Sequence, residues 1–425
     1  MNDQTSGDGT PGSGGSQQVD QPGLTGAQRR VGWAYAGLQG IKGLPEACWA
    51  PLIPAVASRL HLTPTELGNY LLGLSIGLGL GVWVAPHVMA WLGSRTTLRI
   101  GFIGCLGLFP FAPIAPDPIV LGAILGFVGA GFSWVDYVWW IYARAYQIEI
   151  KASRHTMQLL QIPYAPGALA GIGCAALGLH QHWPGFWVLA AVCWTGLAAT
   201  LVMTSPLEPG LDPRKGGEEA TATAQTKRRR NTLALFLILL LAASVMYLPL
   251  GVTNGWSALY LEKLGAKGAL ITYGLVGFYA AQTVGSVIAY FFSDQLKGTA
   301  IVLTGTLLAV AGGLLIAFHL DLWTVVGGFV LVALGLSPAG PYVQTHGTPL
   351  TQQGNHQLRS AALTFASYVG GVVGQPAISR LTALSGSLAI AMLLIPGSAG
   401  VVAIAVILGG SSQSMTGPRL SVHHE

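Results

Sequence analysis

Twelve long apolar runs follow one another along the chain, and they restrict its possible folds more than any other feature does. They lie at 32–57, 67–92, 97–116, 118–143, 157–180, 184–204, 232–260, 269–292, 299–318, 322–344, 359–382 and 387–409. A helix needs about 20 residues to cross the ~30 Å hydrocarbon layer of a bilayer. Because the runs do not alternate with period two, and a lone strand cannot satisfy its backbone in lipid, helices are expected. The sequence predicts an all-α membrane protein with twelve transmembrane helices.

Composition agrees with a membrane location and argues against an enzyme. Of 425 residues, 52% are hydrophobic and only 9% are charged, whereas soluble proteins average roughly 25% charged residues. The sequence contains no phosphate-binding loop and no nucleophile arrangement, so neither an enzyme activity nor a cofactor is expected. No disulfide or metal site is indicated either, because no paired spacing relates the four cysteines, which all lie in apolar runs: Cys48, Cys105, Cys174 and Cys193.

The basic residues predict how the chain crosses the membrane, because Lys and Arg near helix ends stay on the cytoplasmic side. With the N-terminus inside, sixteen of the 21 basic residues fall in the cytoplasm and four outside, with Lys42 left in the membrane. Both termini are therefore expected in the cytoplasm, and the protein, a monomer, in the cytoplasmic (inner) membrane of a bacterium. The KRRR run at 227–230 also suits nucleic acid, but a topology signal explains it better. The predicted surroundings are the lipid bilayer, with no nucleic acid.

A polar stretch near the middle divides the chain. Residues 205–231, SPLEPGLDPRKGGEEATATAQTKRRRN, interrupt the apolar pattern and leave six runs on either side. We expect a cytoplasmic linker here, between half-domains at 29–204 and 232–410. Residues 1–28 are rich in Gly, Ser, Gln and Asp and lack the pattern of a cleavable signal, so a disordered cytoplasmic tail is expected. Residues 411–425 are expected to form a second cytoplasmic tail.

The two halves share weak internal similarity. Trp49 in EACWAPLI and Trp256 in TNGWSALY are 207 residues apart. The two Tyr-x-x-Gly patterns that begin at Tyr164 and Tyr368 are 204 residues apart. Both offsets are close to half the chain, which indicates two pseudo-symmetric six-helix halves. Such duplicated halves are typical of transporters.

The chain resembles the major facilitator superfamily over about residues 29 to 410, and within it the fucose-permease-like branch. The matching stretches are WAPLIPAVASRL at 49–60, ELG at 66–68, Asp136 after a glycine-rich fourth helix, YAPGALAG at 164–171, WSALYL at 256–261 and GQP at 374–376. The resemblance implies a secondary transporter that works by alternating access, with helices one, four, seven and ten around a central cavity. It also implies one carboxylate on the first helix and another on the fourth, which match Glu46 and Asp136.

One motif departs from the superfamily pattern. Members usually carry G-x-x-x-D-R-x-G-R-R between helices two and three, whereas PHVMAWLGSR at 86–95 keeps only Gly93 and Arg95. The equivalent acid of the second half corresponds to Asp294. By resemblance this motif latches the halves together, so its loss affects gating and not the fold.

The first apolar run carries a polar stripe. Tyr35, Gln39, Lys42, Glu46 and Trp49 are spaced 4, 3, 4 and 3, which places them within roughly ±40° on a helix that advances about 100° per residue. A charge in the bilayer centre is costly, so the stripe should face the bundle interior or a water-filled cavity. We therefore expect this face of the helix to line a site.

Two interpretations of the membrane charges remain open. In the structural one, Lys42 neutralises Glu46 as a local pair, or Asp136 forms a permanent salt bridge with Lys42 or Arg144. In the functional one, Asp136, Glu46 and Lys42 couple transport to protons, because an isolated carboxylate in an apolar site favours its neutral form and a nearby Lys opposes that. The functional interpretation is preferred because one carboxylate remains unmatched after Lys42 is paired.

The predicted substrate site consists of aromatic and amide side chains, which suit a neutral polyhydroxylated ligand through stacking and hydrogen bonds. Its residues are Tyr35, Gln39, Trp49, Trp140, Gln161, Tyr164, Asn254, Trp256, Gln282 and Tyr342. The predicted function is proton-coupled symport of a small polar, sugar-like solute. The alternatives are a drug or metabolite exporter working by proton antiport and a non-transporting receptor.

Overall fold

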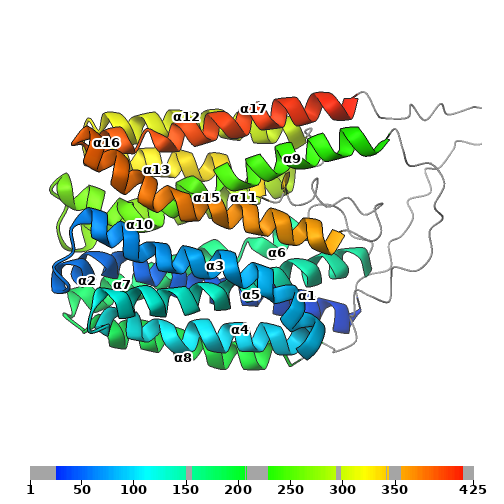
Figure 1. Cartoon of the computed structure of the whole chain (residues 1–425), viewed down its shortest axis with the longest axis horizontal. Helices are drawn as coiled ribbons and strands as arrows, with labels where there is room; N and C mark the ends of the chain where they lie inside the picture. The colour runs from blue at the N-terminus through cyan, green and yellow to red at the C-terminus, as the bar shows by residue number, and fades with distance from the viewer. Residues whose placement is uncertain are drawn as a thin grey trace, which may run out of the picture.

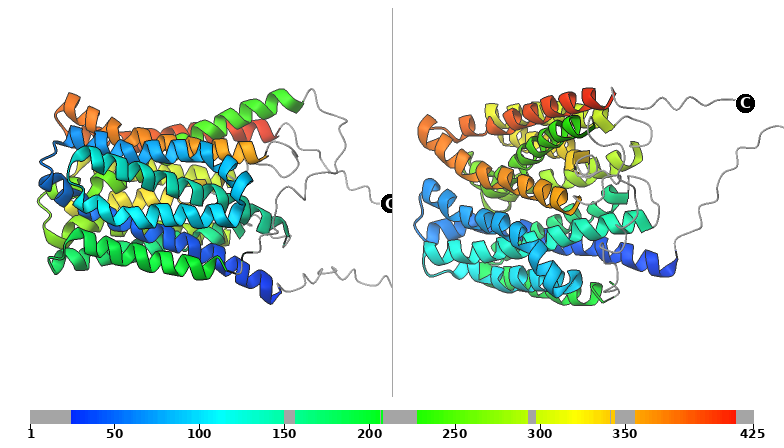
Figure 2. Two further views of the ribbon diagram at one scale, coloured as in Figure 1. Left: turned by 60° about the horizontal axis from the view of Figure 1, so that its bottom comes forward. Right: turned by 45° about the vertical axis from the view of Figure 1, so that its right-hand side comes forward.

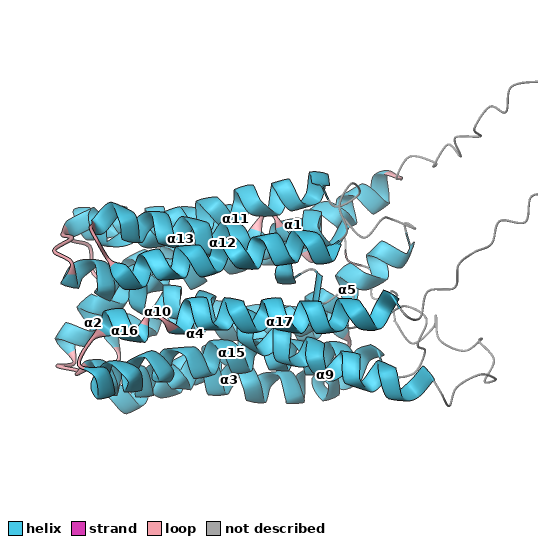
Figure 3. Cartoon of the chain, turned by 90° about the horizontal axis from the view of Figure 1, so that it is seen from above, coloured by secondary structure: helices cyan, strands magenta, loops and turns pink. Residues whose placement is uncertain are grey.

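The computed structural model describes residues 25–149, 156–205, 207, 228–292, 298–340, 342–343 and 356–414. Among these residues the regular elements are all helices, and none is a strand (Figure 3). The long helices are α1 (Gly26–Trp49), α3 (Pro64–Leu92), α4 (Ser94–Leu108), α5 (Pro118–Glu149), α7 (Tyr164–His180), α8 (Gly185–Met203), α9 (Arg228–Met246), α10 (Leu248–Lys263), α11 (Tyr273–Phe292), α12 (Gly298–Phe318), α13 (Leu322–Leu336), α15 (His356–Ser385) and α17 (Leu394–Ser414). The short elements are η1 (Ala50–Leu52), α2 (Ile53–Arg59), η2 (Phe109–Ile114), α6 (Thr156–Gln161), η3 (Gly268–Thr272) and α16 (Leu388–Ala391).

The predicted all-helical membrane fold is confirmed. Nine helical segments in the described part of the chain are long and apolar enough to cross a membrane, and α13 is a shorter apolar helix. The remaining two predicted spans correspond to α1 and α15, which have 24 and 30 residues and carry more polar side chains. The arrangement is consistent with the twelve predicted helices.

Proline residues break several of the predicted spans into two helical pieces. The run at 157–180 divides into α6 and α7 at Pro163, and the run at 232–260 divides into α9 and α10 at Tyr247, just before Pro249. A proline ring removes a backbone donor and clashes with the preceding turn, which favours a break, although Pro45, Pro86 and Pro376 lie inside α1, α3 and α15. The first run continues through η1 and α2 in the same way, past Pro51.

The helices form two groups, which we call the N-terminal group (α1–α8) and the C-terminal group (α9–α17). They lie in the lower and upper parts of the bundle in Figure 1. One apolar core belongs to the N-terminal group and a second to the C-terminal group. A third core joins them, because it packs Ala47 and Ile172 with Leu261 and Leu275. Between the groups, α3 packs on α15 and α7 packs on α11.

The start of α1 and the end of α17 lie at one end of the bundle, together with the start of α9 (Figure 2). We call this the terminal end and the other the opposite end. Both described chain ends thus lie on one side, as an even number of crossings requires. Most of the predicted linker, most of both predicted tails and Asp294 lie outside the described residues. Residues 26–28 and 411–414, which were predicted to belong to the tails, are helical and continue α1 and α17.

Glycines allow one helix pair in each group to approach closely. A Cβ on Gly167 of α7 would lie 2.0 Å from the carbonyl oxygen of Gly40 in α1. A Cβ on Gly370 of α15 would lie 1.5 Å from the carbonyl oxygen of Ser244 in α9. Small residues at helix contacts permit such backbone approach in membranes. Tyr164, at the start of α7, and Tyr368, inside α15, lie close to these contacts and line the cavity described below.

The loop between α3 and α4 ends one helix and starts the next. Gly93 has φ of 79°, and its N–H donates to the carbonyl of Met89 to close the last turn of α3. Arg95 Nη2 donates to the carbonyl oxygen of Ser205 at 3.2 Å, which is a contact within the N-terminal group. The surviving motif arginine therefore binds the end of α8 in this structure.

Candidate functional site

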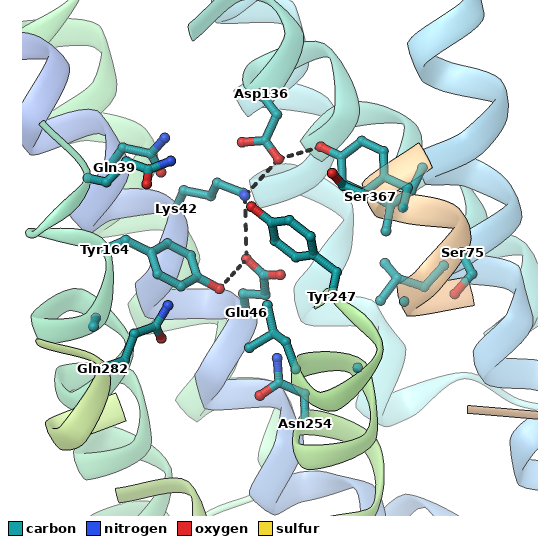
Figure 4. Close-up of a pocket in the computed structure, with 18 of the residues that line it drawn as sticks. Gln39, Lys42, Glu46, Ser75, Asp136, Tyr164, Tyr247, Asn254, Gln282 and Ser367 are labelled. Atoms are coloured by element: carbon teal, nitrogen blue, oxygen red, sulfur yellow. Dashed lines mark hydrogen bonds and ion pairs between the residues drawn. The ribbon is translucent and has the colours of Figure 1, made fainter. Parts of the chain in front are cut away.

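A cavity with a volume of about 190 Å³ lies between the two groups of helices. Its wall combines residues of α1, α3, α5 and α7 with residues of α10, α11 and α15. Figure 4 shows polar and charged side chains from both groups pointing toward one another across it. Residues far apart in the sequence therefore contribute to one site.

Three charged side chains meet in this cavity. Lys42 Nζ donates to Asp136 Oδ2 at 2.8 Å and lies 3.9 Å from Glu46 Oε2 (Figure 4). The side chains of Lys42 and Asp136 are 13% and 9% exposed, while that of Glu46 is 28% exposed. Lys42 thus contacts both carboxylates and lies closer to Asp136. The side chain of Arg144, the other predicted partner, is outside the described part.

Two tyrosines complete the shell around these charges. Tyr164 on α7 donates its hydroxyl to Glu46 Oε2 at 3.1 Å, and its ring centroid lies 5.3 Å from Lys42 Nζ. Tyr368 on α15 donates its hydroxyl to Asp136 Oδ2. An ammonium group near an aromatic face is attracted by the ring, so Tyr164 contacts both members of the local pair. Each carboxylate therefore has an ammonium and a phenol beside it.

The polar stripe predicted on the first helix reaches the cavity over most of its length. Gln39, Lys42, Glu46 and Trp49 all line the wall. Tyr35, the first member, is fully buried outside the lining and packs against the rings of Tyr142 and Tyr146. The stripe extends beyond the cavity toward the terminal end, so Tyr35 belongs to the packing of α1 against α5.

The structure separates the other predicted binding residues into two sets. The residues that line the cavity are Trp140, Gln161, Tyr164, Asn254 and Gln282. Trp256 and Tyr342 do not line it. Trp256 is two residues beyond Asn254, and a step of about 200° puts it on the opposite side of α10, where it is 1% exposed in the apolar core. Tyr342 follows the break at Pro338 and packs against the core of the C-terminal group.

Sequence reasoning missed several lining residues, half of them on α15. These are Ser75, Tyr247, Ser286, Ser337, Thr364, Ser367, Tyr368 and Gln375. On α15 the lining positions 364, 367, 368, 371 and 375 follow the spacing of a single helical face. Two signals pointed to this face, namely the tyrosine repeat with Tyr164 and the GQP stretch that contains Gln375. None of these residues is charged, and an uncharged polar residue in an apolar run does not by itself indicate a site.

Four polar atoms in the lining are buried and have no hydrogen-bond partner among the described residues. They are Trp49 Nε1, Gln282 Oε1, Thr364 Oγ1 and Gln375 Oε1. Asn254 differs, because its Oδ1 accepts from the hydroxyl of Tyr279 at 2.9 Å. Buried polar groups require partners, so the four atoms suit a ligand that carries its own hydrogen-bonding groups. Three of them belong to the C-terminal group, while all three charges belong to the N-terminal group.

The comparisons with known proteins agree with this architecture. No family model matches the chain. An uncharacterized MFS-type transporter of Yersinia pestis is 28% identical over 400 residues, which cover 91% of this chain and 98% of that protein. An uncharacterized transporter of Sinorhizobium fredii is 23% identical over 304 residues, covering 71% of this chain and 78% of that protein.

Solved structures share the fold over almost the whole chain. The transporter FucP in its outward conformation superposes with a TM-score of 0.64 at 14% identity, covering 90% of this chain and 99% of FucP. A variant of the E. coli fucose:proton symporter FucP gives a TM-score of 0.62 at 14% identity, covering 89% of this chain and 98% of that one. The nucleoside transporter NupG gives 0.61 at 13% identity, covering 91% and 99%.

The chain has the fold of multi-pass membrane transporters and is similar to an MFS-type transporter over 91% of its length. The resemblance to the major facilitator superfamily, predicted from the sequence motifs, is confirmed by the Yersinia relative. The predicted resemblance to the fucose-permease-like branch is supported structurally, since the fold is shared with FucP, and at a similar TM-score with NupG.

Proposed function

We propose that the chain moves a small polar, sugar-like solute across the bacterial cytoplasmic membrane by alternating access, in symport with protons. The observation that carries the proposal is the charge balance of the cavity, where one ammonium faces two carboxylates, Glu46 and Asp136. An unmatched carboxylate in an apolar environment is costly, and proton uptake removes the cost. A site that gains a proton when closed and loses it to water couples proton movement to transport.

The distribution of polar atoms supports a neutral solute. The one ammonium in the described lining already contacts two carboxylates, so an anionic solute finds no spare cation there. The partnerless atoms of Gln282, Thr364 and Gln375 are amide and hydroxyl oxygens, which accept hydrogen bonds from hydroxyl groups. Trp140 and Tyr164 line the same cavity and offer aromatic faces for a sugar ring. The fold neighbours described as a fucose:proton symporter and a nucleoside transporter are compatible with such a solute.

The proposal includes the overall arrangement. Residues 29–204 and 232–410 form the two halves that move relative to each other, and the polar stretch at 205–231 joins them on the cytoplasmic side. The terminal end of the bundle faces the cytoplasm, and the transporter acts as a monomer. Solute exchanges between the two sides of the membrane as the cavity opens at alternate ends.

The test uses purified protein in proteoliposomes. An inward proton gradient is imposed, and accumulation of labelled neutral sugars and nucleosides is measured against liposomes without a gradient and liposomes with a protonophore. Symport predicts accumulation that needs the gradient and disappears with the protonophore. Solute loss driven by the inward gradient would instead identify a proton antiporter of the exporter class, and no movement of any probe in either direction would favour a receptor.

A further inference from the structure

Two tyrosines at corresponding places in the halves bind carboxylates in different ways. Tyr164 donates to Glu46 within the N-terminal group. Tyr368, which is 204 residues later, donates to Asp136, and this bond crosses from α15 of the C-terminal group to α5 of the N-terminal group. One phenol therefore joins two helices of one group, while its counterpart joins the two groups.

The two tyrosines bind different carboxylates because the helices beside them carry different charges. Tyr164 lies beside α1, which carries Glu46, whereas α15 packs on α10, which has no carboxylate at the corresponding position. With the offset of 207 residues that relates Trp49 to Trp256, the counterparts of Lys42 and Glu46 are Pro249 and Thr253. The Thr253 hydroxyl donates to the carbonyl of Pro249 at 2.7 Å, within α10. Tyr368 thus meets no carboxylate at the position where Tyr164 meets Glu46. Its hydroxyl reaches across the cavity instead.

The surroundings of Asp136 combine groups from both sides of the cavity. Lys42 and Glu46 on α1 belong to the N-terminal group, with Lys42 Nζ at 2.8 Å from Asp136 Oδ2. Tyr368 on α15 and Tyr247, between α9 and α10, belong to the C-terminal group. The same oxygen, Asp136 Oδ2, accepts from both Lys42 and Tyr368. The charge of this carboxylate therefore acts on both groups at once.

A second contact between the groups lies close to this bond. The rings of Trp83 on α3 and Phe365 on α15 meet edge to face with centroids 5.4 Å apart. Phe365 is three residues before Tyr368, which puts both side chains on neighbouring positions of α15. Packing and hydrogen bonding thus hold α15 against the N-terminal group at the same level of the bundle.

We propose that Tyr368 is a positioning residue that makes the separation of the two groups depend on the charge of Asp136. While Asp136 is charged, the phenol holds α15 against α5. A proton on Asp136 cancels the charge, weakens its bonds to both Tyr368 and Lys42, and lets the groups part beside the cavity. A hydrogen bond to a charged group is stronger than one to a neutral group, so its loss should shift the equilibrium between the two arrangements by about tenfold. The proposal rests on the proposed proton coupling and adds the group that transmits it.

The test compares Tyr368→Phe with Tyr164→Phe, which removes the corresponding phenol without touching the bond between the groups. Spin labels at Thr96→Cys in α4 and Ala300→Cys in α12, in a Cys174→Ser background, report the distance between the groups. The distances are measured across a pH series without solute or gradient. We expect the parent protein and Tyr164→Phe to shift toward longer distances as pH falls. Tyr368→Phe should show the longer distances at every pH.

A second variant covers the case in which Tyr368→Phe does not fold. Asp136→Asn removes the charge and keeps the size of the side chain, so it should also show the longer distances at every pH. Distances that match the parent protein at every pH, in either variant, would overturn the proposal, as would an equal loss of the pH response in Tyr164→Phe. Because no solute or gradient is involved, this result is separate from the proteoliposome test. The parent protein could accumulate solute with protons while the spin-label distances of Tyr368→Phe match those of the parent protein. That pair of results would overturn the inference about Tyr368 and leave the proposed function standing.

Discussion

At the scale of single residues, Lys42 decides the charge balance of the cavity. Its ammonium lies 2.8 Å from Asp136 Oδ2 and 3.9 Å from Glu46 Oε2, so two carboxylates share one cation. Breaking a buried pair by removing one partner costs about 3–5 kcal/mol, because a buried charge is left uncompensated. Residues in one such network do not contribute additively. The three charges and their two tyrosines are therefore best regarded as one network, and the proposed coupling assigns a single proton to it.

The first prediction concerns Asp136 and the driving force. Asp136→Asn mimics the protonated carboxyl permanently, so gradient-driven accumulation should fall to simple equilibration, while solute binding and counterflow exchange persist. Asp117→Asn is the matched control. Asp117 directly precedes α5 and accepts a hydrogen bond from the N–H of Val120 in its first turn, and Asn caps helices equally well. Uptake and exchange in proteoliposomes measure both properties. Accumulation against a gradient by Asp136→Asn with the parent pH profile would make Asp136 a structural partner only.

At the scale of helices, the close contacts between elements decide where the site residues stand. The approach of α7 to α1 is what brings Tyr164 within 3.1 Å of Glu46. Gly43 on α1 also allows this close approach, because a Cβ on Gly43 would lie 2.2 Å from the carbonyl oxygen of Tyr164 on α7. Packed helix interfaces do not deform continuously. A change of one methyl group at such a contact should therefore displace the whole helix.

The second prediction tests this contact with two glycines of the same helix. Gly167→Ala adds a methyl group that would lie 2.0 Å from the carbonyl oxygen of Gly40. Gly173→Ala adds a methyl group that would have nothing within 4 Å. Overpacking of this kind costs about 1–3 kcal/mol. We expect Gly167→Ala to lower the thermal unfolding temperature in detergent and Gly173→Ala to leave it unchanged. Equal behaviour of the two variants would mean that α7 and α1 are not held this closely.

The third prediction concerns the start of α13 outside the membrane-spanning segments. The N–H of Thr324 donates to Asp321 Oδ1 at 2.7 Å, and this hydrogen bond lowers the pKa of the Asp321 carboxyl from its ordinary value of 3.8. A lowered folded-state pKa means that the contribution to stability is present above the ordinary value and is lost as pH falls through the folded value. Asp321→Ala should therefore lower the unfolding temperature at neutral pH, and its effect should shrink at strongly acidic pH.

Thermal unfolding of the parent protein and of Asp321→Ala at several pH values checks this. Asp321→Asn is the matched control, because it retains an N-cap acceptor without a charge. Because its amide does not titrate, the difference in unfolding temperature between Asp321→Asn and Asp321→Ala should stay the same at all pH values. An equal loss of stability in Asp321→Ala at neutral and at strongly acidic pH would contradict the assigned role of the charge.

At the scale of the whole molecule, the cavity lies where the two groups face each other. The N-terminal group supplies the three charges, and the C-terminal group supplies most of the partnerless polar atoms. A core shared by both groups packs Leu261 and Leu275 with residues of α1 and α7. Because the two groups supply different parts of the cavity wall, we expect their relative movement to change two things at once. These are the access to the cavity and the contacts that its charged side chains make across it.

The fourth prediction concerns orientation in the membrane. Ala220→Cys lies in the predicted linker and should react with a membrane-impermeant thiol reagent only after the cells are permeabilised. Lys267→Cys, exposed at the opposite end of the bundle, should react in intact cells. Both are made in the Cys174→Ser background, because Cys174 is the exposed native cysteine among the described residues. Labelling of Ala220→Cys in intact cells would reverse the predicted orientation.

The sequence by itself determined the class of protein and the position of its helices. The predicted spans agree with the described helices to within a few residues at most ends, because apolar runs of about 20 residues have few alternatives in a bilayer. It also identified the polar face of α1, since Gln39, Lys42, Glu46 and Trp49 follow the helical period. These features are local, and hydrophobic length and periodicity are sufficient to predict them.

Only the tertiary structure decided which uncharged faces meet the cavity and which partners the charges take. The helical period puts Asn254 and Trp256 on opposite sides of α10, but the sequence could not show which of them faces the cavity, because the rotation of α10 depends on its packing against neighbouring helices. Nor could it pair Tyr368 with Asp136, which lies 232 residues earlier in the chain. That bond exists because close contacts hold α15 beside α5 and because α10 offers Tyr368 no carboxylate. Long-range pairings depend on how helices pack, and the period of a single helix carries no information about its partner.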